Sequence, residues 1–177
     1  MKVFVLGESR TGTTSVHEYL VRSGLPSIHY FVPESGVVEP IHKNRAANWP
    51  KVQNFIENSG YDAFSDYPIR LFYRELAATF PDAFFILTVR RDFAKWRESM
   101  NVILDEESVD FGLLQAYYLC YNEEIRCNCT DLGLRFLELC IEDDATSNAQ
   151  KLSDFLGLDY HGPLLRLNTT EEFAAQK

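Results

Sequence analysis

The feature that most constrains the fold is a glycine-containing loop between a short apolar run and a helical pattern. Residues 2–6 are mostly apolar, as expected of a buried parallel strand, and Gly7 follows directly. From Thr13 the apolar residues recur at helical spacing, up to an exit signal at Gly24. The backbone N–H groups that open a helix have no partners inside it and lie at the positive end of its dipole. We therefore predict that residues 7–14 bind an anion such as a phosphate or a sulfate.

The rest of the chain continues to alternate between strand and helix patterns. We predict further strands over Tyr61–Ser65, Ala83–Val89 and Leu134–Leu139, and we interpret Ser27–Val32 as a second strand or its continuation into a loop. We predict helices over Trp49–Ser59, Leu71–Phe80, Asp92–Val102, Phe111–Cys129 and Ala149–Leu156, and a loop over Pro33–Arg45. This alternation predicts an α/β fold, a three-layer sandwich with a central parallel sheet, similar to that of the P-loop nucleoside triphosphatases. Residues 1–177 are predicted to form a single domain.

Composition and charge narrow the classes of partner. The formal net charge of −9 makes nucleic acid and anionic membrane surfaces poor general partners, because like charges repel. No apolar run reaches the length of a membrane span, and the N-terminus lacks the pattern of a signal peptide. The spacing of the four cysteines fits neither a zinc site nor a disulfide framework. We expect a cytoplasmic protein without a metal ion, and we leave its oligomeric state open.

The spacing of the two loop glycines, Gly7-x4-Gly12, is that of the nucleoside triphosphatase P-loop. That loop requires a Lys directly after the second glycine, where it reaches the β- and γ-phosphates, and this chain has Thr13 there. A cation does occur in the loop, but it is Arg10, before the second glycine. This difference argues against a nucleotide kinase or a nucleoside triphosphatase, which we keep as an alternative function.

The segment Arg10-Thr11-Gly12-Thr13-Thr14 resembles the donor-binding loop of the sulfotransferases that use 3′-phosphoadenosine 5′-phosphosulfate (PAPS). In that family a cation is followed by Ser or Thr, Gly, Thr and Thr, and here Arg replaces the more usual Lys. The resemblance implies that these five residues contact the donor, and that Arg10 also stabilises negative charge during transfer. The alternative is a glycine-rich turn that binds nothing.

A second segment resembles the same family at the end of the predicted strand Ala83–Val89. The family has an Arg after this strand and a Ser eight residues later, and both side chains hold the donor's 3′-phosphate. Arg91 and Ser99 have this spacing, although a shift of one residue would give the role to Arg90. Phe93 departs from the family pattern, which has Pro there. The alternative is that the two arginines only end the strand and face solvent.

Two residues are candidates for the general base that removes the acceptor's proton. Asp66 is the first, because many cytosolic members of the family have a catalytic His near the end of the corresponding strand. Since Pro68 follows closely, Asp66 is equally well interpreted as a helix N-cap. His29 is the second candidate, although a lone His beside aromatic residues is more often structural.

Together these resemblances imply a small sulfotransferase that moves a sulfuryl group from PAPS to a hydroxyl or amine acceptor by in-line displacement. By analogy with phosphoryl transfer, the protein aligns the reactants and neutralises charge, and no metal is required. The expected partner is a small-molecule acceptor. A third interpretation is a non-catalytic nucleotide-binding protein of the same fold, because the chain is short for this superfamily.

Overall fold

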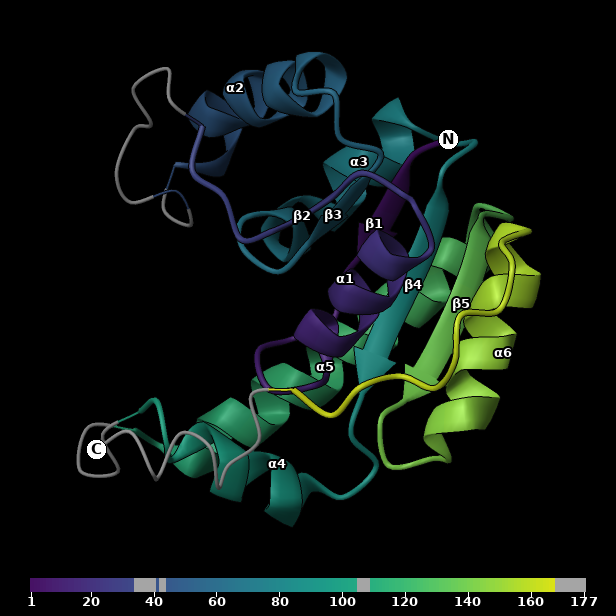
Figure 1. The fold of residues 1–177 in the computed structure, drawn as a ribbon. Coiled ribbons are helices and arrows are strands. Elements are labelled where there is room, and N and C mark those ends of the chain that lie inside the picture. The colour runs from purple at the N-terminus through teal and green to yellow at the C-terminus, as the bar shows by residue number, and fades with distance from the viewer. Residues whose placement is uncertain (34–40, 42–43, 105–108, 168–177) are drawn as a thin grey trace.

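The computed structural model describes residues 1–33, 41, 44–104 and 109–167. Within these residues, five parallel strands form one sheet in the order β2-β3-β1-β4-β5, with helices on both faces (Figure 1). The strands are β1 (Val3–Val5), β2 (Ser27–His29), β3 (Ala63–Ser65), β4 (Phe84–Val89) and β5 (Arg135–Cys140). The helices are α1 (Thr13–Arg22), α2 (Arg45–Asn58), α3 (Tyr73–Thr79), α4 (Phe93–Met100), α5 (Phe111–Asp131) and α6 (Ala145–Leu156), with a 3-10 turn η1 (Ile69–Phe72) before α3. The predicted α/β class with a central parallel sheet is confirmed.

Strand β1 lies where the order of the strands reverses. It pairs with β3 on one side, in the register Val5↔Ser65, and with β4 on the other, in the register Val5↔Ile86. Parallel strands place their carboxyl ends at one edge of the sheet, and ligands of open α/β sheets bind at that edge where the strand order reverses. The loop after β1 therefore opens onto the edge where a ligand is expected.

The alternation of side chains along β1 divides the core into two layers. Phe4 and Leu6 point to the face covered by α2, α3 and α5, whereas Val3 and Val5 point to the face covered by α1 and α6. All four side chains are fully buried. The three-layer sandwich predicted from the sequence is thus confirmed.

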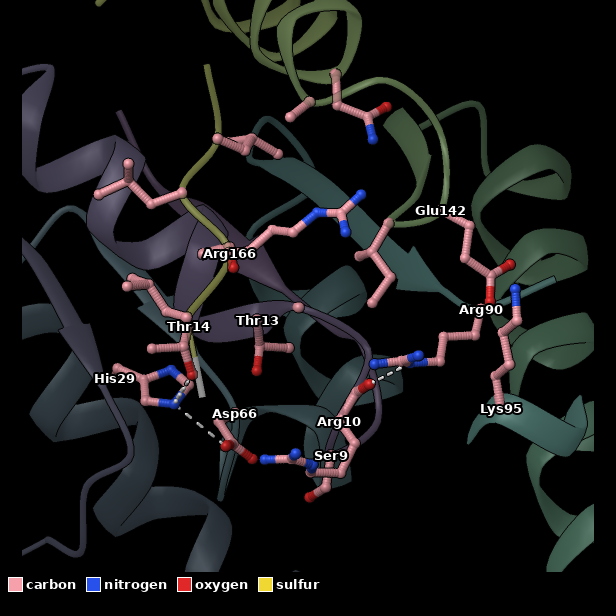
Figure 2. A pocket seen from close by; sticks show the side chains of 18 of the residues that line it. Ser9, Arg10, Thr13, Thr14, His29, Asp66, Arg90, Lys95, Glu142 and Arg166 are labelled. Carbon is pink, nitrogen blue, oxygen red and sulfur yellow. Dashed lines mark hydrogen bonds and ion pairs between the residues drawn. The ribbon is translucent and has the colours of Figure 1, made fainter. Parts of the chain in front are cut away.

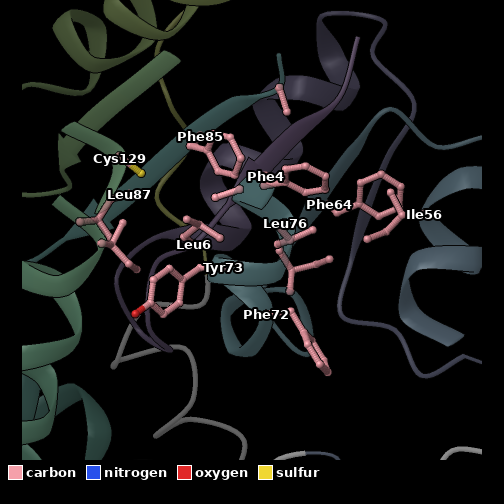
Figure 3. Packing of buried hydrophobic residues seen from close by; sticks show 14 of the residues in the cluster. Phe4, Leu6, Ile56, Phe64, Phe72, Tyr73, Leu76, Phe85, Leu87 and Cys129 are labelled. Carbon is pink, nitrogen blue, oxygen red and sulfur yellow. The ribbon is translucent and has the colours of Figure 1, made fainter. Parts of the chain in front are cut away.

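Phenylalanines from three neighbouring strands form the centre of the layer beneath α2, α3 and α5. The centroid of the Phe4 ring lies 5.9 Å from that of Phe64 and 5.6 Å from that of Phe85 (Figure 3). Ile56 and Leu76 pack against these rings from the covering helices. Such aromatic pairs add to the stabilisation that burial provides. They hold β1, and hence the loop that follows it, against both of its neighbours.

Two helices begin earlier than the sequence pattern indicated. Helix α2 begins before the predicted Trp49 and therefore contains Pro50 within it rather than in its first turn. Helix α6 begins at Ala145 rather than Ala149, because the carboxylate of Asp144 caps it. The earlier start of α6 brings an additional turn of helix to the carboxyl edge of the sheet.

The second strand is shorter than predicted. It ends at His29, because Tyr30 has a φ of 59°, outside the extended region. Most of the predicted loop over Pro33–Arg45 lies outside the described residues. Among the helices that are described, none is both long enough and apolar enough to cross a membrane.

Candidate active site

The loop between β1 and α1 leaves the start of α1 open. Gly12 is the N-cap residue with a φ of 93°, and within the described chain no side chain caps the first turn. The N–H groups of that turn therefore remain available at the carboxyl edge of the sheet. Gly7 is required because of close packing, since a Cβ there would lie 1.8 Å from Oγ1 of Thr88. The two glycines give the loop a shape that other residues would disturb.

Buried polar contacts hold the loop on its inner side. Glu8 is almost completely buried, and its carboxylate accepts hydrogen bonds from Arg70 at 2.6 Å and from the Tyr117 hydroxyl at 2.8 Å. Burial and the nearby Glu8 raise the pKa of Tyr117, so its hydroxyl remains a donor. The Thr11 hydroxyl donates to the Glu8 carbonyl oxygen at 2.5 Å and lies 2.8 Å from that of Thr88. The Thr11 side chain therefore closes the loop internally, and its predicted contact with a donor stays a prediction.

Helix α4 supports the loop from the other side. The Trp96 indole donates to the Ser9 carbonyl oxygen at 3.0 Å, and Nε of Arg10 donates to the Ser99 hydroxyl at 2.8 Å. Trp96 and Ser99 are both buried. Helix α4 thus fixes the backbone at Ser9 and the side chain of Arg10 together. Ser99, expected to hold a phosphate, contacts the cation of the loop in this structure.

The two consecutive arginines after β4 have opposite surroundings. Arg90 lines the pocket at this edge, and its Nε donates to the Arg10 carbonyl oxygen at 2.8 Å (Figure 2). The Arg91 side chain is 70% exposed and pairs with Asp143 at 2.7 Å. The hydrogen bond that Arg91 donates to the Asp143 carboxylate raises the pKa of Arg91. The spacing to Ser99 favoured Arg91 as the phosphate anchor and left Arg90 as the alternative. Of the two, Arg90 is the one whose side chain lines the pocket.

The two candidate bases, Asp66 and His29, lie side by side just after β3 and at the end of β2. Oδ2 of Asp66 is 3.4 Å from Nε2 of His29, and the same nitrogen is 3.2 Å from Oγ1 of Thr14 (Figure 2). Nδ1 of His29 is 2.8 Å from the Ser65 hydroxyl. The pairing of β2 with β3, in the register His29↔Ser65, brings these residues together. The His29–Asp66 pair is therefore within hydrogen-bond reach of the first turn of α1.

The electrostatics of this pair favour a neutral imidazole. Burial lowers the pKa of His29, and the charge of Asp66 opposes this change without cancelling it. A neutral His can accept a proton near pH 7. The interpretation of Asp66 as a helix N-cap is not supported, because its carboxylate accepts from the adjacent Tyr67 N–H at 2.8 Å. The 3-10 turn that follows has Pro68 at its N-cap position and no capping side chain among the described residues.

Three non-glycine residues with left-handed backbone conformations lie at this edge of the sheet. Arg10, Tyr30 and Asp66 have φ values of 68°, 59° and 63°, and they follow β1, β2 and β3 respectively. Outside glycine such conformations cost about 1–3 kcal/mol each and persist where the surrounding structure fixes them. Their position at three adjacent strand ends makes this edge a candidate functional region.

A pocket of about 610 Å³ joins these groups. Thr13 and Thr14 from the first turn of α1 line its middle, and the His29–Asp66 pair lies toward the β2–β3 side (Figure 2). Beyond the loop the pocket continues to the start of α6, where Asn148 lines it. Among the described residues, no group of three or more His, Cys, Asp or Glu side chains could hold a metal ion.

Two further cations in the pocket were not identified from the sequence. Lys95 comes from α4, and Arg166 comes from residues 158–167, a segment after α6 that we call the strap. Figure 2 shows Arg166 pointing into the same space as Arg90. Glu98 and Glu142 also line the pocket, so its charge is mixed. Lys95 lies within the second segment that resembles the family, between Arg91 and Ser99, but was given no role there. Arg166 belongs to no local motif, and only the folded chain brings it to the site.

Comparison with known proteins shows the family of the chain. A family model described as a sulfotransferase domain matches residues 2–156. The match contains all of the strands and helices named above, together with the loop and the His29–Asp66 pair. No curated protein sequence matches the chain significantly. Because the family model covers most of the chain, and the fold and the loop agree with it, this protein belongs to the sulfotransferase domain family.

Proposed function

We propose that the protein transfers a sulfuryl group from PAPS to a hydroxyl or amine on a small-molecule acceptor. The observation that supports this most directly is the arrangement of the pocket. The open start of α1, Arg10 and Arg90 line the same pocket as the His29–Asp66 pair. Transfer of an anionic group to a hydroxyl requires an anion-binding region and a proton acceptor at close range.

In this proposal the phosphosulfate of the donor binds at the first turn of α1. The N–H groups of that turn and the hydroxyls of Thr13 and Thr14 donate hydrogen bonds to it, together with Arg10. Arg90 holds the 3′-phosphate, because a guanidinium can bind two phosphate oxygens at once. Ser99 acts through Arg10, whose guanidinium it positions.

The transfer step is an in-line displacement at sulfur. The acceptor oxygen or nitrogen forms a bond to sulfur while the bond from sulfur to the bridging oxygen breaks, and that electron pair leaves on the 5′-phosphate. The acceptor's proton passes to the His29–Asp66 pair, where burial keeps His29 neutral. Arg10 and the loop N–H groups stabilise the charge that develops on the bridging oxygen.

Two observations support the finer parts of this proposal. The pocket volume of about 610 Å³ is in the range of small-molecule sites, which are roughly 300–1,000 Å³. All four cysteines are free thiols. Free thiols are typical of reducing compartments, so we propose a cytoplasmic location.

Calorimetric titration with 3′-phosphoadenosine 5′-phosphate tests the donor half of the proposal. We expect binding that is at least ~10-fold tighter than that of adenosine 5′-phosphate, which lacks the 3′-phosphate and so loses charge-assisted hydrogen bonds. Arg10→Ala should weaken binding of the bisphosphate. If the intact protein does not bind the bisphosphate, or instead turns over ATP with magnesium, the proposal is wrong.

The acceptor half is tested by His29→Gln. This variant should bind 3′-phosphoadenosine 5′-phosphate nearly as the unmodified protein does, because Gln keeps a polar group beside the Thr14 hydroxyl. It should lose transfer of radiolabelled sulfate from PAPS to a panel of small alcohols, phenols and amines. Transfer at an unchanged rate by the variant would exclude His29 from the role of base.

A further inference from the structure

The two ring nitrogens of His29 have different surroundings. Nε2 lies 3.2 Å from Oγ1 of Thr14 and 3.4 Å from Oδ2 of Asp66, and both of these residues line the pocket (Figure 2). Nδ1 lies 2.8 Å from the hydroxyl of Ser65, a residue that is only 1% exposed. A substrate in the pocket can therefore exchange a proton with Nε2, whereas Nδ1 faces a buried side chain.

The position of the proton on the neutral ring decides whether His29 can act as a base. A neutral imidazole carries one proton, and only the nitrogen without it can accept another. If Nε2 is to take a proton from a substrate, the proton that the ring already carries must be on Nδ1. A buried N–H requires a hydrogen-bond acceptor, because leaving it unpaired is costly. The hydroxyl oxygen of Ser65 is at hydrogen-bond distance from Nδ1 and meets this requirement.

A second contact of the Ser65 hydroxyl sets the direction of these hydrogen bonds. Its Oγ also donates to the carbonyl oxygen of Ile28, at 3.4 Å. A carbonyl oxygen accepts hydrogen bonds and cannot donate them, and a hydroxyl has a single proton to give. When both contacts are made, Nδ1–H of His29 donates to Ser65 and Ser65 donates to Ile28. The pairing of β2 with β3, in the register His29↔Ser65, holds the three groups together.

The charged and titratable groups around the ring come from β3 and α1. Burial lowers the pKa of His29, and the charges of Asp66 and Glu18 oppose this change. The ring of His17 lies 5.5 Å from that of His29, and burial lowers the pKa of His17 as well. The ring of His29 is therefore neutral before the reaction. Once Nε2 gains a proton, the carboxylate of Asp66 faces the new positive charge.

We propose that Ser65 is a positioning residue, which holds the proton of neutral His29 on Nδ1 so that Nε2 receives the proton of the acceptor. This inference rests on the proposed function, in which the His29–Asp66 pair removes that proton, and it assigns the step to one atom. The bond between hydrogen and the acceptor oxygen or nitrogen breaks, and its electron pair stays on that atom. The proton joins the lone pair of Nε2. The resulting imidazolium donates from Nδ1 to Ser65 and from Nε2 to Asp66.

The tautomer of His29 in the intact protein, without any donor, tests the inference directly. The ¹⁵N chemical shifts of labelled histidine distinguish a ring nitrogen that carries a proton from one that does not. The spectrum is recorded at about pH 8, where a histidine with an ordinary or lowered pKa is neutral. The signals of His29 are those that His29→Gln lacks. We expect the proton on Nδ1. A proton on Nε2 would overturn the inference, because Asp66 would then be the base, and it would leave the proposed function in place.

Ser65→Ala tests the consequence for transfer. Without an acceptor at Nδ1, the proton of the neutral ring should move to Nε2, beside Asp66. The kcat for transfer of radiolabelled sulfate from PAPS to the best acceptor of the panel should fall roughly 10-fold, the effect of about one hydrogen bond on the ratio of the two tautomers. The affinity for 3′-phosphoadenosine 5′-phosphate and the KM of the acceptor should stay within about twofold, because Ser65 acts only through His29.

Ser27→Ala is the matched control. The hydroxyl of Ser27 lies 2.8 Å from Nδ1 of His17, the same type of contact on the same strand, and in the described chain neither residue lines the pocket. This control should keep the kcat and the tautomer of His29. An unchanged kcat in Ser65→Ala, or an equal loss in both variants, would exclude Ser65 from the role. If Ser65→Ala does not fold, the spectrum of the unmodified protein still decides. Failure of the unmodified protein to transfer sulfate would overturn the proposed function, and the role of Ser65 with it.

Discussion

Helices α1, α4 and α6 each begin at the carboxyl edge of the sheet, but their first turns have different partners. Asp92 caps α4 by accepting from the N–H groups of Ala94 and Lys95, and Asp144 caps α6 by accepting from that of Ser147. Helix α1 begins at a glycine, without a capping side chain in the described chain. A carboxylate already occupies two of the three positive helix ends. The difference teaches that a helix N-terminus can bind an anion only where the N–H groups of its first turn have no capping side chain.

The largest expected effect is on stability, and it comes from a substitution in the loop that precedes the open N-terminus of α1. In Gly7→Ala the new Cβ would meet the Thr88 hydroxyl at 1.8 Å and the Thr88 carbonyl oxygen at 2.8 Å. We expect a loss of roughly 3 kcal/mol in the free energy of unfolding, measured by urea denaturation. Gly112→Ala is the control, because a Cβ there meets only the Asp110 carboxylate, at 3.2 Å. Equal urea midpoints for the two variants would contradict the tight packing of the loop.

The next largest effect is on donor binding, and it distinguishes Arg90 from its neighbour Arg91. Arg90→Ala should weaken binding of 3′-phosphoadenosine 5′-phosphate by roughly 10- to 100-fold, the usual range for a hydrogen bond to a charged group. Arg91→Ala should change it less than about twofold, since the Arg91–Asp143 pair is exposed. Calorimetry on both variants measures the difference. The opposite result would return the anchor to Arg91 and place the donor nearer the start of α4.

A smaller effect on stability is expected at the capped N-terminus of α6. Asp144→Ala removes the acceptor for the Ser147 N–H and should cost about 1 kcal/mol of stability. Donor affinity should remain within about twofold, because this cap serves its own helix. Asp154→Ala, on the exposed surface of α6, is the control and should change stability by less than about 0.5 kcal/mol. Similar stabilities for the two variants would show that the cap contributes little.

The smallest expected effect is a shift in pH dependence. Protonation of His29 removes the base, so kcat/KM should fall as the pH decreases through its pKa, which burial places below the ordinary 6.5. The charge of Asp66 raises that pKa, so Asp66→Asn should move the acid limb to lower pH. A pH profile of sulfate transfer measures both. His17→Gln is the control and should keep its acid limb, since His17 does not line the pocket.

If the acid limb of Asp66→Asn coincides with that of the unmodified protein, the charge of Asp66 does not act on the proton acceptor. If His17→Gln loses the limb, the titrating group is His17. Burial and the neighbouring His29 lower the pKa of His17 as well, so the control is informative.

The loop, the strands and the order of elements could be predicted because each is a local pattern. The two glycines and Arg10 lie close together in the sequence, within residues 7–14, and the apolar run before them forms β1. The pairing of neighbouring strands could not be predicted in this way, because it joins residues that are far apart in the sequence. Asp66 and His29 could each be named as candidates, but the register His29↔Ser65 brings them together.

Other parts of the site depend on contacts that no local pattern contains. Arg90 and Arg91 are adjacent in sequence, and the partner that holds Arg91 outside the pocket is Asp143, which follows β5. Asn148 was predicted to lie outside α6, and the Asp144 cap moves the start of the helix before it. Arg166 reaches the pocket because the strap returns across the fold, where Arg22 donates to two of its carbonyl groups.

The buried ion pair between Glu8 and Arg70 has a consequence for the evolution of sequences in this family. Glu8 lies in the donor loop, and Arg70 lies in the turn just after Asp66, so one ion pair connects the two halves of the site. Replacing one partner alone leaves the other charge buried and unpaired, which costs several kcal/mol, roughly 3–5. Relatives that lose Glu8 should therefore have lost Arg70 as well. In aligned relatives, the two positions are expected to be inherited as a unit.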